Sequence, residues 1–358
     1  MFCFLLINLG CFAFAPPDWP EILQKPYAKF PIPDLGLQPL LVTSNGKKII
    51  TKDDWGKARK ALEETWLEQL GKPPAKPDLL DVRIVETKKL VGYTRQLLSF
   101  SSEGDDRIRA YLLTPLALKP KEKRPVVVVF HSTTRETLKE PTELGKDPER
   151  AYALHLVRRG YITLCPECYI LKDPDGWASG QAKALEKRRP GWTGLGKLTF
   201  DASRCVDFLE TLPIVDKERI GCCGFSLGAK EVLYAMAFEP RYKVGVFNEG
   251  GIGLRMSNWT DSWYLTEKIK RRIPEMEHHQ LLALIAPRPF LILGGDAADG
   301  DASWPFIEAV LPVYRLLEAS DRIGLFNHKG KHSFPSQARK LAYAWLDSWL
   351  GFKPEKED

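Results

Sequence analysis

Residues 219–238 read RIGCCGFSLGAKEVLYAMAF, and this stretch decides the fold. The apolar run at 219–223 is typical of a strand buried in a sheet, and it leads through Gly224-Phe225-Ser226-Leu227-Gly228 into a helical pattern at 227–238. Glycine is needed two residues on either side of the serine, because a Cβ there would collide with neighbouring backbone in so sharp a turn. Such a turn lifts the Ser226 hydroxyl above the sheet. Ser226 is therefore our candidate nucleophile, with a purely structural glycine-rich turn as the alternative.

The sequence around this turn alternates between strand and helix patterns. Apolar runs that fit buried parallel strands lie at 126–130, 161–164, 244–247, 290–293 and 323–326. Helical patterns lie between them, at 149–159, 200–212, 276–285, 305–318 and 336–350. Shorter alternating runs near 82–85, 93–100 and 108–113 predict antiparallel strands. We predict one α/β domain over 81–352, a doubly wound, mostly parallel sheet with helices on both faces and its site at the carboxyl ends of the strands.

Two segments precede this domain. The first fifteen residues, MFCFLLINLGCFAFA, carry no charge and end in Ala13-Phe14-Ala15, which favours a signal peptide over 1–15 and a secreted or periplasmic location. A misassigned start codon or a buried apolar strand is the alternative. Residues 16–80 predict a proline-rich extended arm followed by an amphipathic helix that Thr51 caps and Gly71 ends. No segment is long and apolar enough for a membrane span.

Composition excludes several classes of protein. The 358 residues are 44% hydrophobic and 27% charged, as in soluble globular proteins, and the net charge of +6 lacks the clustering that nucleic-acid binding requires. Outside the predicted signal peptide an odd number of cysteines remains, so no complete disulfide framework is implied; they are Cys165, Cys168, Cys205, Cys222 and Cys223. Cys165 and Cys168 have redox-pair spacing, but small apolar residues or one structural bridge is the simpler interpretation.

A serine nucleophile needs a histidine base and an acid that orients it. Four histidines follow Ser226; His278 and His279 fall in a helical pattern, whereas His332 follows the last strand, so we favour His332 with His328 second.

Two acids remain open. Glu249 stands among glycines just after the strand at 244–247, and Asp301 follows the next strand with Pro305 starting a helix; we rank Glu249 first and Asp301 second. Oxyanion donors are predicted from the Leu227 backbone N–H and from the loop His131-Ser132-Thr133, with Ser132 as the candidate. A His131 side chain that only caps this loop is an equally good interpretation.

Over about residues 50–350 the sequence resembles α/β-hydrolases, in particular acetyl xylan esterase-like and glucuronoyl esterase-like carbohydrate esterases. The resemblance is carried by the serine turn with Lys230 and by PGWT at 190–193, DASR at 201–204, VDKERIG at 215–221 and LALIAPRP at 282–289. It implies that Glu249 is the acid and that Lys230, four residues after the nucleophile, contacts the sugar. Glucuronoyl esterases carry arginine directly after the nucleophile, where this chain has Leu227. Dienelactone hydrolases share the fold but use cysteine in place of serine.

Tryptophans offer a further hint about the substrate. Five of them lie in loops after strand ends, and of these Trp259 and Trp304 are our candidates for stacking on a sugar, unless they only hold the loops to the core. We predict a secreted serine esterase that cleaves acyl or uronoyl esters of a polysaccharide such as xylan, with a polysaccharide or small ester as its partner and no metal or cofactor. The alternatives are a non-catalytic carbohydrate-binding protein and a prolyl oligopeptidase-like peptidase, although the 125 residues before the core are too few for a propeller domain.

Overall fold

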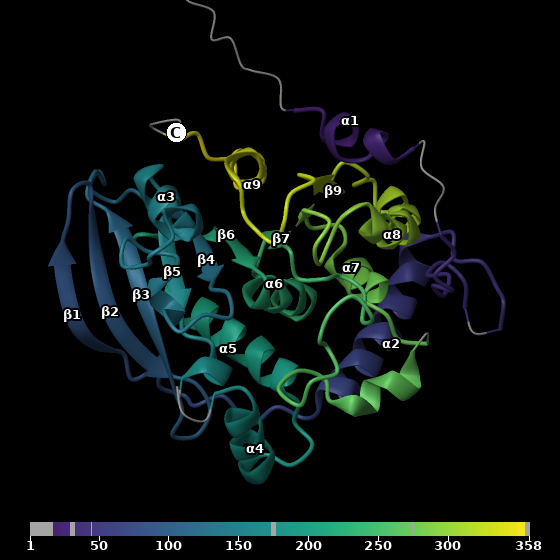
Figure 1. Ribbon diagram of the computed structural model, residues 1–358, viewed down its shortest axis with the longest axis horizontal. Coiled ribbons are helices and arrows are strands. Elements are labelled where there is room, and N and C mark those ends of the chain that lie inside the picture. The colour runs from purple at the N-terminus through teal and green to yellow at the C-terminus, as the bar shows by residue number, and fades with distance from the viewer. Residues whose placement is uncertain (1–16, 29–32, 44, 173–176, 274, 355–358) are drawn as a thin grey trace, which may run out of the picture.

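The structure is a computed structural model that describes residues 17–28, 33–43, 45–172, 177–273 and 275–354. Its centre is a nine-stranded sheet in the order β1-β2-β3-β5-β4-β6-β7-β8-β9 (Figure 1). The strands are β1 Arg83–Lys89, β2 Tyr93–Ser101, β3 Arg107–Pro115, β4 Arg124–Phe130, β5 Ile162–Pro166, β6 Val215–Phe225, β7 Val244–Asn248, β8 Phe290–Gly294 and β9 Ile323–Asn327. The first three strands are antiparallel, β3 pairs antiparallel with β5, and β5, β4 and β6–β9 run parallel. The predicted mostly parallel sheet is confirmed.

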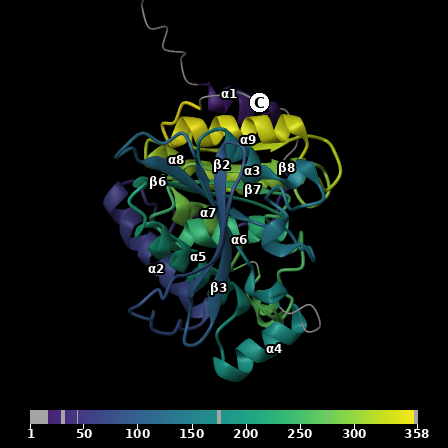
Figure 2. The same cartoon turned by 90° about the vertical axis from the view of Figure 1, so that its left-hand side faces the viewer.

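Helices cover both faces of this sheet (Figures 1 and 2). They are α1 Trp19–Leu23, α2 Lys52–Leu70, α3 Tyr152–Arg158, α4 Ser179–Arg188, α5 Gly194–Leu209, α6 Leu227–Phe238, α7 His279–Ile285, α8 Trp304–Leu316 and α9 Ser336–Trp349. The sequence patterns miss α4 and begin α5 six residues late, because Pro190, Gly194 and Gly196 favour a loop there. In the structure Thr193 caps α5 by accepting a hydrogen bond from the Gly196 N–H at 3.1 Å.

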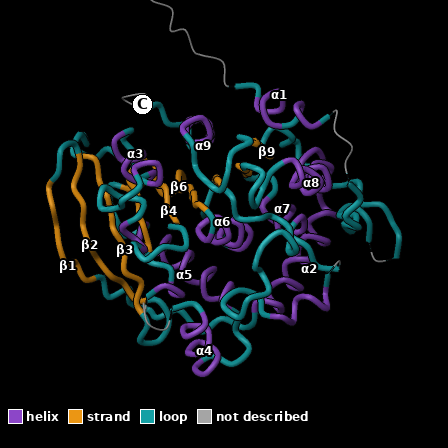
Figure 3. The backbone as a smooth tube through the Cα atoms, in the orientation of Figure 1, coloured by secondary structure: helices purple, strands orange, loops and turns teal. Residues whose placement is uncertain are grey.

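The period-2 alternation of the strands divides the interior into two cores. Val126 and Val128 of β4 face a core formed with α2, α5, α6, α7 and α8. Val127 and Val129 face the opposite core, formed with α1, α3 and α9. A strand buried on both faces must be apolar at every position, which is why β4 reads as a continuous β-branched run. Figure 3 shows the strands, the helices around them and the loops that join these elements.

The segment before the sheet is more ordered than the predicted extended arm. Residues 19–23 form α1, and Trp19 and Leu23 are buried against α9 and β9. Trp19 meets Trp345 edge-on at 4.9 Å, and a Cβ on Gly324 of β9 would lie 2.4 Å from Leu23. The arm therefore covers the edge strand of the sheet, a contact between distant residues that a local proline count does not reveal.

The remaining expectations about this part of the chain have different outcomes. The amphipathic helix is confirmed as α2, whose cap Thr51 accepts a hydrogen bond from the Asp54 N–H at 3.1 Å. The predicted signal peptide, 1–15, lies outside the described residues. None of the helices in the described ranges has the length and hydropathy of a membrane span.

Cysteines 165, 168, 205, 222 and 223 are all buried and free, so the pair at 165 and 168 is not a disulfide here.

Candidate active site

Ser226 stands at the junction of β6 and α6 in a strained conformation, with φ 58° and ψ −112°. Its N–H donates to the carbonyl oxygen of Asn248 at 2.8 Å, which holds the turn against the end of β7. A Cβ on Gly224 would lie 2.3 Å from the Gly228 carbonyl, and one on Gly228 would lie 2.1 Å from the Phe130 oxygen. The two glycines are therefore required by close approach of backbone, as the sequence pattern predicts, and Ser226 is left half-buried at the carboxyl end of the sheet.

Glu249 follows β7, the strand next to the serine turn, and also has a positive φ of 56°. Its side chain is fully buried. Oε2 accepts the backbone N–H groups of Ala298 at 2.8 Å and Asp299 at 3.3 Å. These two donors stabilise an ionised carboxylate away from water. The loop after β8 thus fixes the orientation of Glu249.

His332 lies against this carboxylate, with Nδ1 3.5 Å from Oε2 of Glu249. Its ring packs on the ring of Phe225, the residue before the serine, with centroids 4.7 Å apart. The His332 side chain is 41% exposed, so part of the imidazole is accessible to solvent. The structure therefore brings His332, Glu249 and the serine turn together from three separate parts of the chain.

His328, the second choice for the base, occupies a different place beside the same acid. Its Nε2 lies 3.8 Å from Oε1 of Glu249, and both side chains are fully buried. Its Nδ1 accepts the N–H of Gly330 at 3.2 Å. Burial lowers the pKa of His328, although the charge of Glu249 opposes that shift. A Cβ on Gly295 would lie 2.2 Å from the His328 ring, so this contact also depends on a glycine. His328 therefore lies beside the other oxygen of the Glu249 carboxylate and is buried, whereas His332 is exposed.

Asp301, the alternative acid, is directed elsewhere. Its carboxylate forms an ion pair with Lys329 and accepts the Asn327 side-chain amide at 3.1 Å. No ion pair joins it to a histidine in the described part of the chain. Asp299 is buried and accepts the N–H groups of Gly251 and Ile252 at 2.7 and 2.8 Å, and burial raises its pKa to about 6. These aspartates therefore shape the loops around Glu249.

The oxyanion donors are placed only in part as expected. Leu227 is the first residue of α6, where a backbone N–H has no partner within the helix. The structure does not direct Ser132 to such a role, because its N–H and hydroxyl both donate to the buried carboxylate of Glu140, at 2.7 and 2.6 Å. His131 bridges its own loop to Cys168, whose N–H donates to Nε2 at 3.0 Å. The capping interpretation of His131 fits this geometry.

Lys230 points from α6 into the protein and is 4% exposed. Its ammonium donates to the Ser257 hydroxyl at 2.8 Å and lies 5.0 and 5.4 Å from the ring centroids of Trp259 and Tyr264. Among the described residues it forms no ion pair; burial lowers its pKa to about 8, against the attraction of Asp299 and Asp261. A buried ammonium with spare donors is suited to hold an oxygen-rich ligand.

The two candidate tryptophans are core residues in this structure. Trp259 is fully buried, and its indole N–H donates to the Gly251 oxygen at 2.7 Å. Trp304 is 7% exposed and stacks on Tyr27 of the N-terminal segment, with centroids 4.7 Å apart. Both rings hold loops to the core, and Trp259 also forms one wall around Lys230.

The sequence analysis missed three residues of this region, which are Arg150, Glu140 and Ser257. Arg150 lies with its guanidinium 4.9 Å from the Phe225 ring and donates to Glu140 at 3.1 Å. Ser257 bonds Lys230 from a long loop. None of the three has a local sequence signature, because each acts through a contact with a distant segment.

Known proteins share this arrangement of the chain. The profile of the dienelactone hydrolase family matches residues 108–247, which include the serine turn. The solved structure of a glucuronoyl esterase from Solibacter usitatus superposes with a TM-score of 0.69 at 19% identity, over 88% of this chain and 98% of that chain. The chain has the α/β-hydrolase fold.

Other proteins similar to this chain include carbohydrate esterases. A 4-O-methyl-glucuronoyl methylesterase from Wolfiporia cocos is 28% identical over 183 residues, which cover 42% of this chain and 45% of that protein. The chain thus matches less than half the length of that curated relative. A putative acetyl xylan esterase from Bacteroides fragilis superposes with a TM-score of 0.60 at 16% identity, over 82% of this chain and 79% of that chain. The predicted resemblance to these two groups is confirmed.

Proposed function

We propose that this α/β-hydrolase is a serine esterase that cleaves a carboxylic ester on a polysaccharide, with a uronoyl ester as the favoured substrate. The observation that carries the proposal is the convergence of three groups. Ser226 lies on a strained turn, His332 packs on the ring of Phe225, the residue before Ser226, and the Glu249 carboxylate lies against Nδ1 of His332. The names of the relatives point to esters of glucuronic acid.

In this proposal Glu249 fixes the tautomer of the base. The carboxylate faces Nδ1 of His332, so the neutral ring carries its proton there and presents Nε2 as the acceptor. Nε2 takes the proton of Ser226 as Oγ attacks the ester carbonyl. The same proton then passes to the departing alcohol oxygen, and the C–O bond of the ester breaks. Water, deprotonated by His332, attacks the carbonyl of the acyl-enzyme; the bond between this carbon and Oγ breaks, His332 returns the proton to Ser226 Oγ, and the acid is released.

The negative oxygen of each tetrahedral intermediate lies, in this proposal, at the start of α6. The Leu227 N–H and the dipole of this twelve-residue helix stabilise the charge there. A second donor comes from the loop after β4, which packs on Gly228. Because Leu227 replaces an arginine of glucuronoyl esterases, the buried ammonium of Lys230 is the cation that remains to contact the sugar.

We place the enzyme outside the cytoplasm, as the apolar first fifteen residues predict. A polymer of uronate-bearing sugars is too large to enter a cell intact, so a polysaccharide esterase has to meet its substrate there. Export is tested by comparing the N-terminal residue of the protein recovered outside the cells with Pro16, which follows the expected cleavage site.

The decisive experiment compares Ser226→Ala with the wild type on p-nitrophenyl acetate, acetylated xylan and a benzyl ester of glucuronic acid. We expect loss of at least about 10³-fold in kcat on every cleaved ester, loss of labelling by a fluorophosphonate, and a preference for the glucuronate ester. Ser179→Ala on the exposed side of α4 is the matched control and should retain both properties. An unchanged rate in Ser226→Ala would contradict the proposal. Polysaccharide binding without labelling would indicate the non-catalytic binding protein, and cleavage of peptides alone would indicate the peptidase.

A further inference from the structure

We propose that the groove between α3 and α9 is a second binding site, which takes the carboxylate groups of an acidic polysaccharide. It is formed by residues that the ester-cleaving machinery does not use. The inference rests on the proposed function only for the identity of the polymer, since the groove itself is defined by its own geometry and charge.

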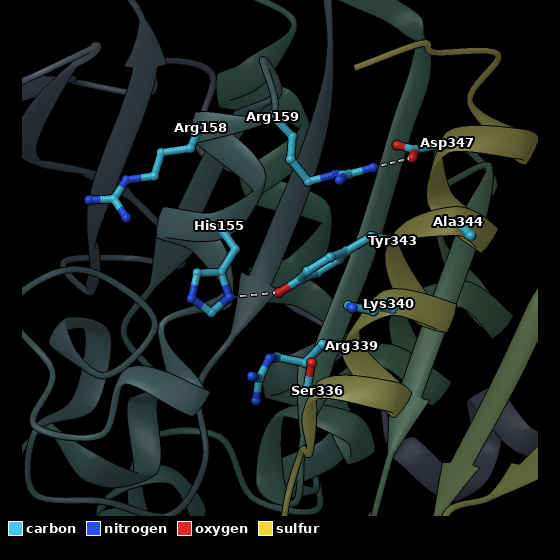
Figure 4. A pocket seen from close by; sticks show the side chains of 9 residues that line it. All are labelled: His155, Arg158, Arg159, Ser336, Arg339, Lys340, Tyr343, Ala344 and Asp347. Carbon is cyan, nitrogen blue, oxygen red and sulfur yellow. Dashed lines mark hydrogen bonds and ion pairs between the residues drawn. The ribbon is translucent and has the colours of Figure 1, made fainter. Parts of the chain in front are cut away.

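The groove has a volume of about 750 Å³. Figure 4 shows that its side chains come from α3, from the residue that follows it, and from α9. The lining residues are His155, Arg158, Arg159, Ser336, Arg339, Lys340, Tyr343, Ala344 and Asp347. Four of them are permanent cations and only one is a carboxylate. A cavity of this size with so unequal a charge favours an anionic occupant.

Helical periodicity explains why these side chains share one face. On α9 the lining positions from Ser336 to Asp347 recur in the helical pattern i, i+3, i+4, i+7, i+8, i+11, so they form one stripe along the helix. The stripe is on the order of 16 Å long at 1.5 Å per residue. His155, Arg158 and Arg159 have the same spacing at the end of α3. The groove between these two sets of side chains suits a chain of sugars better than a single small ion.

Part of the positive charge is already balanced within the protein. Arg159 forms an ion pair with Asp347, which also accepts the Tyr161 hydroxyl at 2.7 Å. Arg339 donates to the Phe334 oxygen and lies 3.6 Å from a Glu149 carboxylate oxygen. These contacts hold the walls of the groove in place, and they pair Arg159 and Arg339 with carboxylates of the protein itself.

Arg158 and Lys340 differ from Arg159 and Arg339 in exposure and in pairing. Both are exposed, one on each helix, and neither forms an ion pair within the described ranges of the chain. Both side chains line the groove, so an anion held there is attracted by both charges. The guanidinium of Arg158 offers a planar fork for a carboxylate, and the ammonium of Lys340 offers a second contact.

The position of the groove connects it to the candidate active site. Arg339 binds the carbonyl of Phe334, two residues after His332, so the start of α9 joins the groove to the loop that carries the candidate base. A polymer held by its uronate carboxylates along α9 has its next sugars directed toward that loop. We infer that the groove raises the local concentration of polymeric substrate and leaves the chemistry of ester cleavage unchanged.

The test measures binding of glucuronoxylan by isothermal titration calorimetry, with Ser226→Ala as the background so that no ester is consumed. Arg158→Gln/Lys340→Gln is the test variant. Lys57→Gln/Lys60→Gln on the exposed face of α2 removes the same charge and is the matched control. We expect the test variant to bind about threefold to thirtyfold more weakly, the control to bind normally, and the affinity to fall with salt. Carboxyl-reduced glucuronoxylan, which is neutral, should bind with the same affinity to the Ser226→Ala background, the test variant and the α2 control.

The outcomes separate this inference from the proposed function. With active Ser226, the test variant should show a raised KM on esterified glucuronoxylan and an unchanged KM and kcat on the benzyl glucuronate ester. Equal weakening by the α2 control would overturn the inference in favour of net charge alone. Unchanged binding in the test variant would also overturn it, and so would binding of the carboxyl-reduced polymer to the Ser226→Ala background that is as tight as binding of unreduced glucuronoxylan. Normal groove binding in a protein that cleaves no ester would instead remove the proposed function and leave the groove.

Discussion

Replacing Lys230 by methionine should make the protein more stable near neutral pH while weakening its activity. The ammonium is 4% exposed, has one hydrogen bond, to Ser257, and forms no ion pair among the described residues. Burial lowers its pKa from 10.5 to about 8, which means that the folded state holds this proton less tightly than the unfolded state. Methionine keeps a similar length and shape without the charge.

The pKa shift sets the size of the effect. At about 1.36 kcal/mol per pKa unit, the difference between 10.5 and about 8 corresponds to a cost of about 3 kcal/mol while Lys230 is charged in both states. The unfolded chain binds more protons between these two values, so wild-type stability rises as the pH passes from 8 to 10.5. The ring contacts and the Ser257 bond offset part of the cost. We therefore expect Lys230→Met to exceed the wild type by about 1–3 kcal/mol at pH 7.

Urea denaturation at pH 7 and pH 10 measures this difference directly. Other groups titrate equally in both proteins, so their contributions cancel, and the gap should shrink by about 2–3 kcal/mol at the higher pH. Lys57→Met on the exposed face of α2 controls for replacing a lysine. Activity should fall by about tenfold to a hundredfold in kcat/KM on the glucuronate ester, because a donor to the sugar is lost. A gap that stays constant between the two pH values would refute the reasoning, since it would mean that Lys230 is not a buried, uncompensated charge.

Three further substitutions test the site and its support. Glu249→Gln should lower kcat by about 10² to 10⁴, whereas Asp301→Asn should change it by less than about threefold; steady-state kinetics on one ester decides, and the reverse order would make Asp301 the acid. Gly228→Ala should cost about 1–3 kcal/mol or more, measured by urea denaturation, because its Cβ would lie 2.1 Å from the Phe130 oxygen; a neutral result would contradict the tight turn. Trp304→Ala should lower the free energy of unfolding by about 3–5 kcal/mol and leave KM on the glucuronate ester unchanged, because the N-terminal segment covers the indole ring. A raised KM with little loss of stability would instead indicate that Trp304 contacts the sugar.

Much of the fold follows from local patterns in the sequence. The runs at 126–130, 244–247 and 290–293 consist of apolar residues because they are buried on both faces, and that composition is visible without any tertiary contact. The helix at 227–238 and the glycines around Ser226 are likewise visible in the sequence, although Gly228 is also required by the distant Phe130 backbone on the neighbouring strand β4. Residues 177–199 are the exception: α4 and the start of α5 are helical despite glycine and proline nearby, because packing overrides weak propensity.

The sequence by itself determined the strands of the sheet, the sharp turn that carries the candidate nucleophile Ser226, and a short choice of partners for it. Only the tertiary structure decided which partners meet: it places Glu249 against His332, pairs Asp301 with Lys329, and ties Ser132 to Glu140. It also assigns Trp259 and Trp304 to the core. The physical reason is that local backbone geometry depends on neighbouring residues, whereas the partner of a charged or polar side chain is whichever distant group the packing of the sheet brings within about 3 Å.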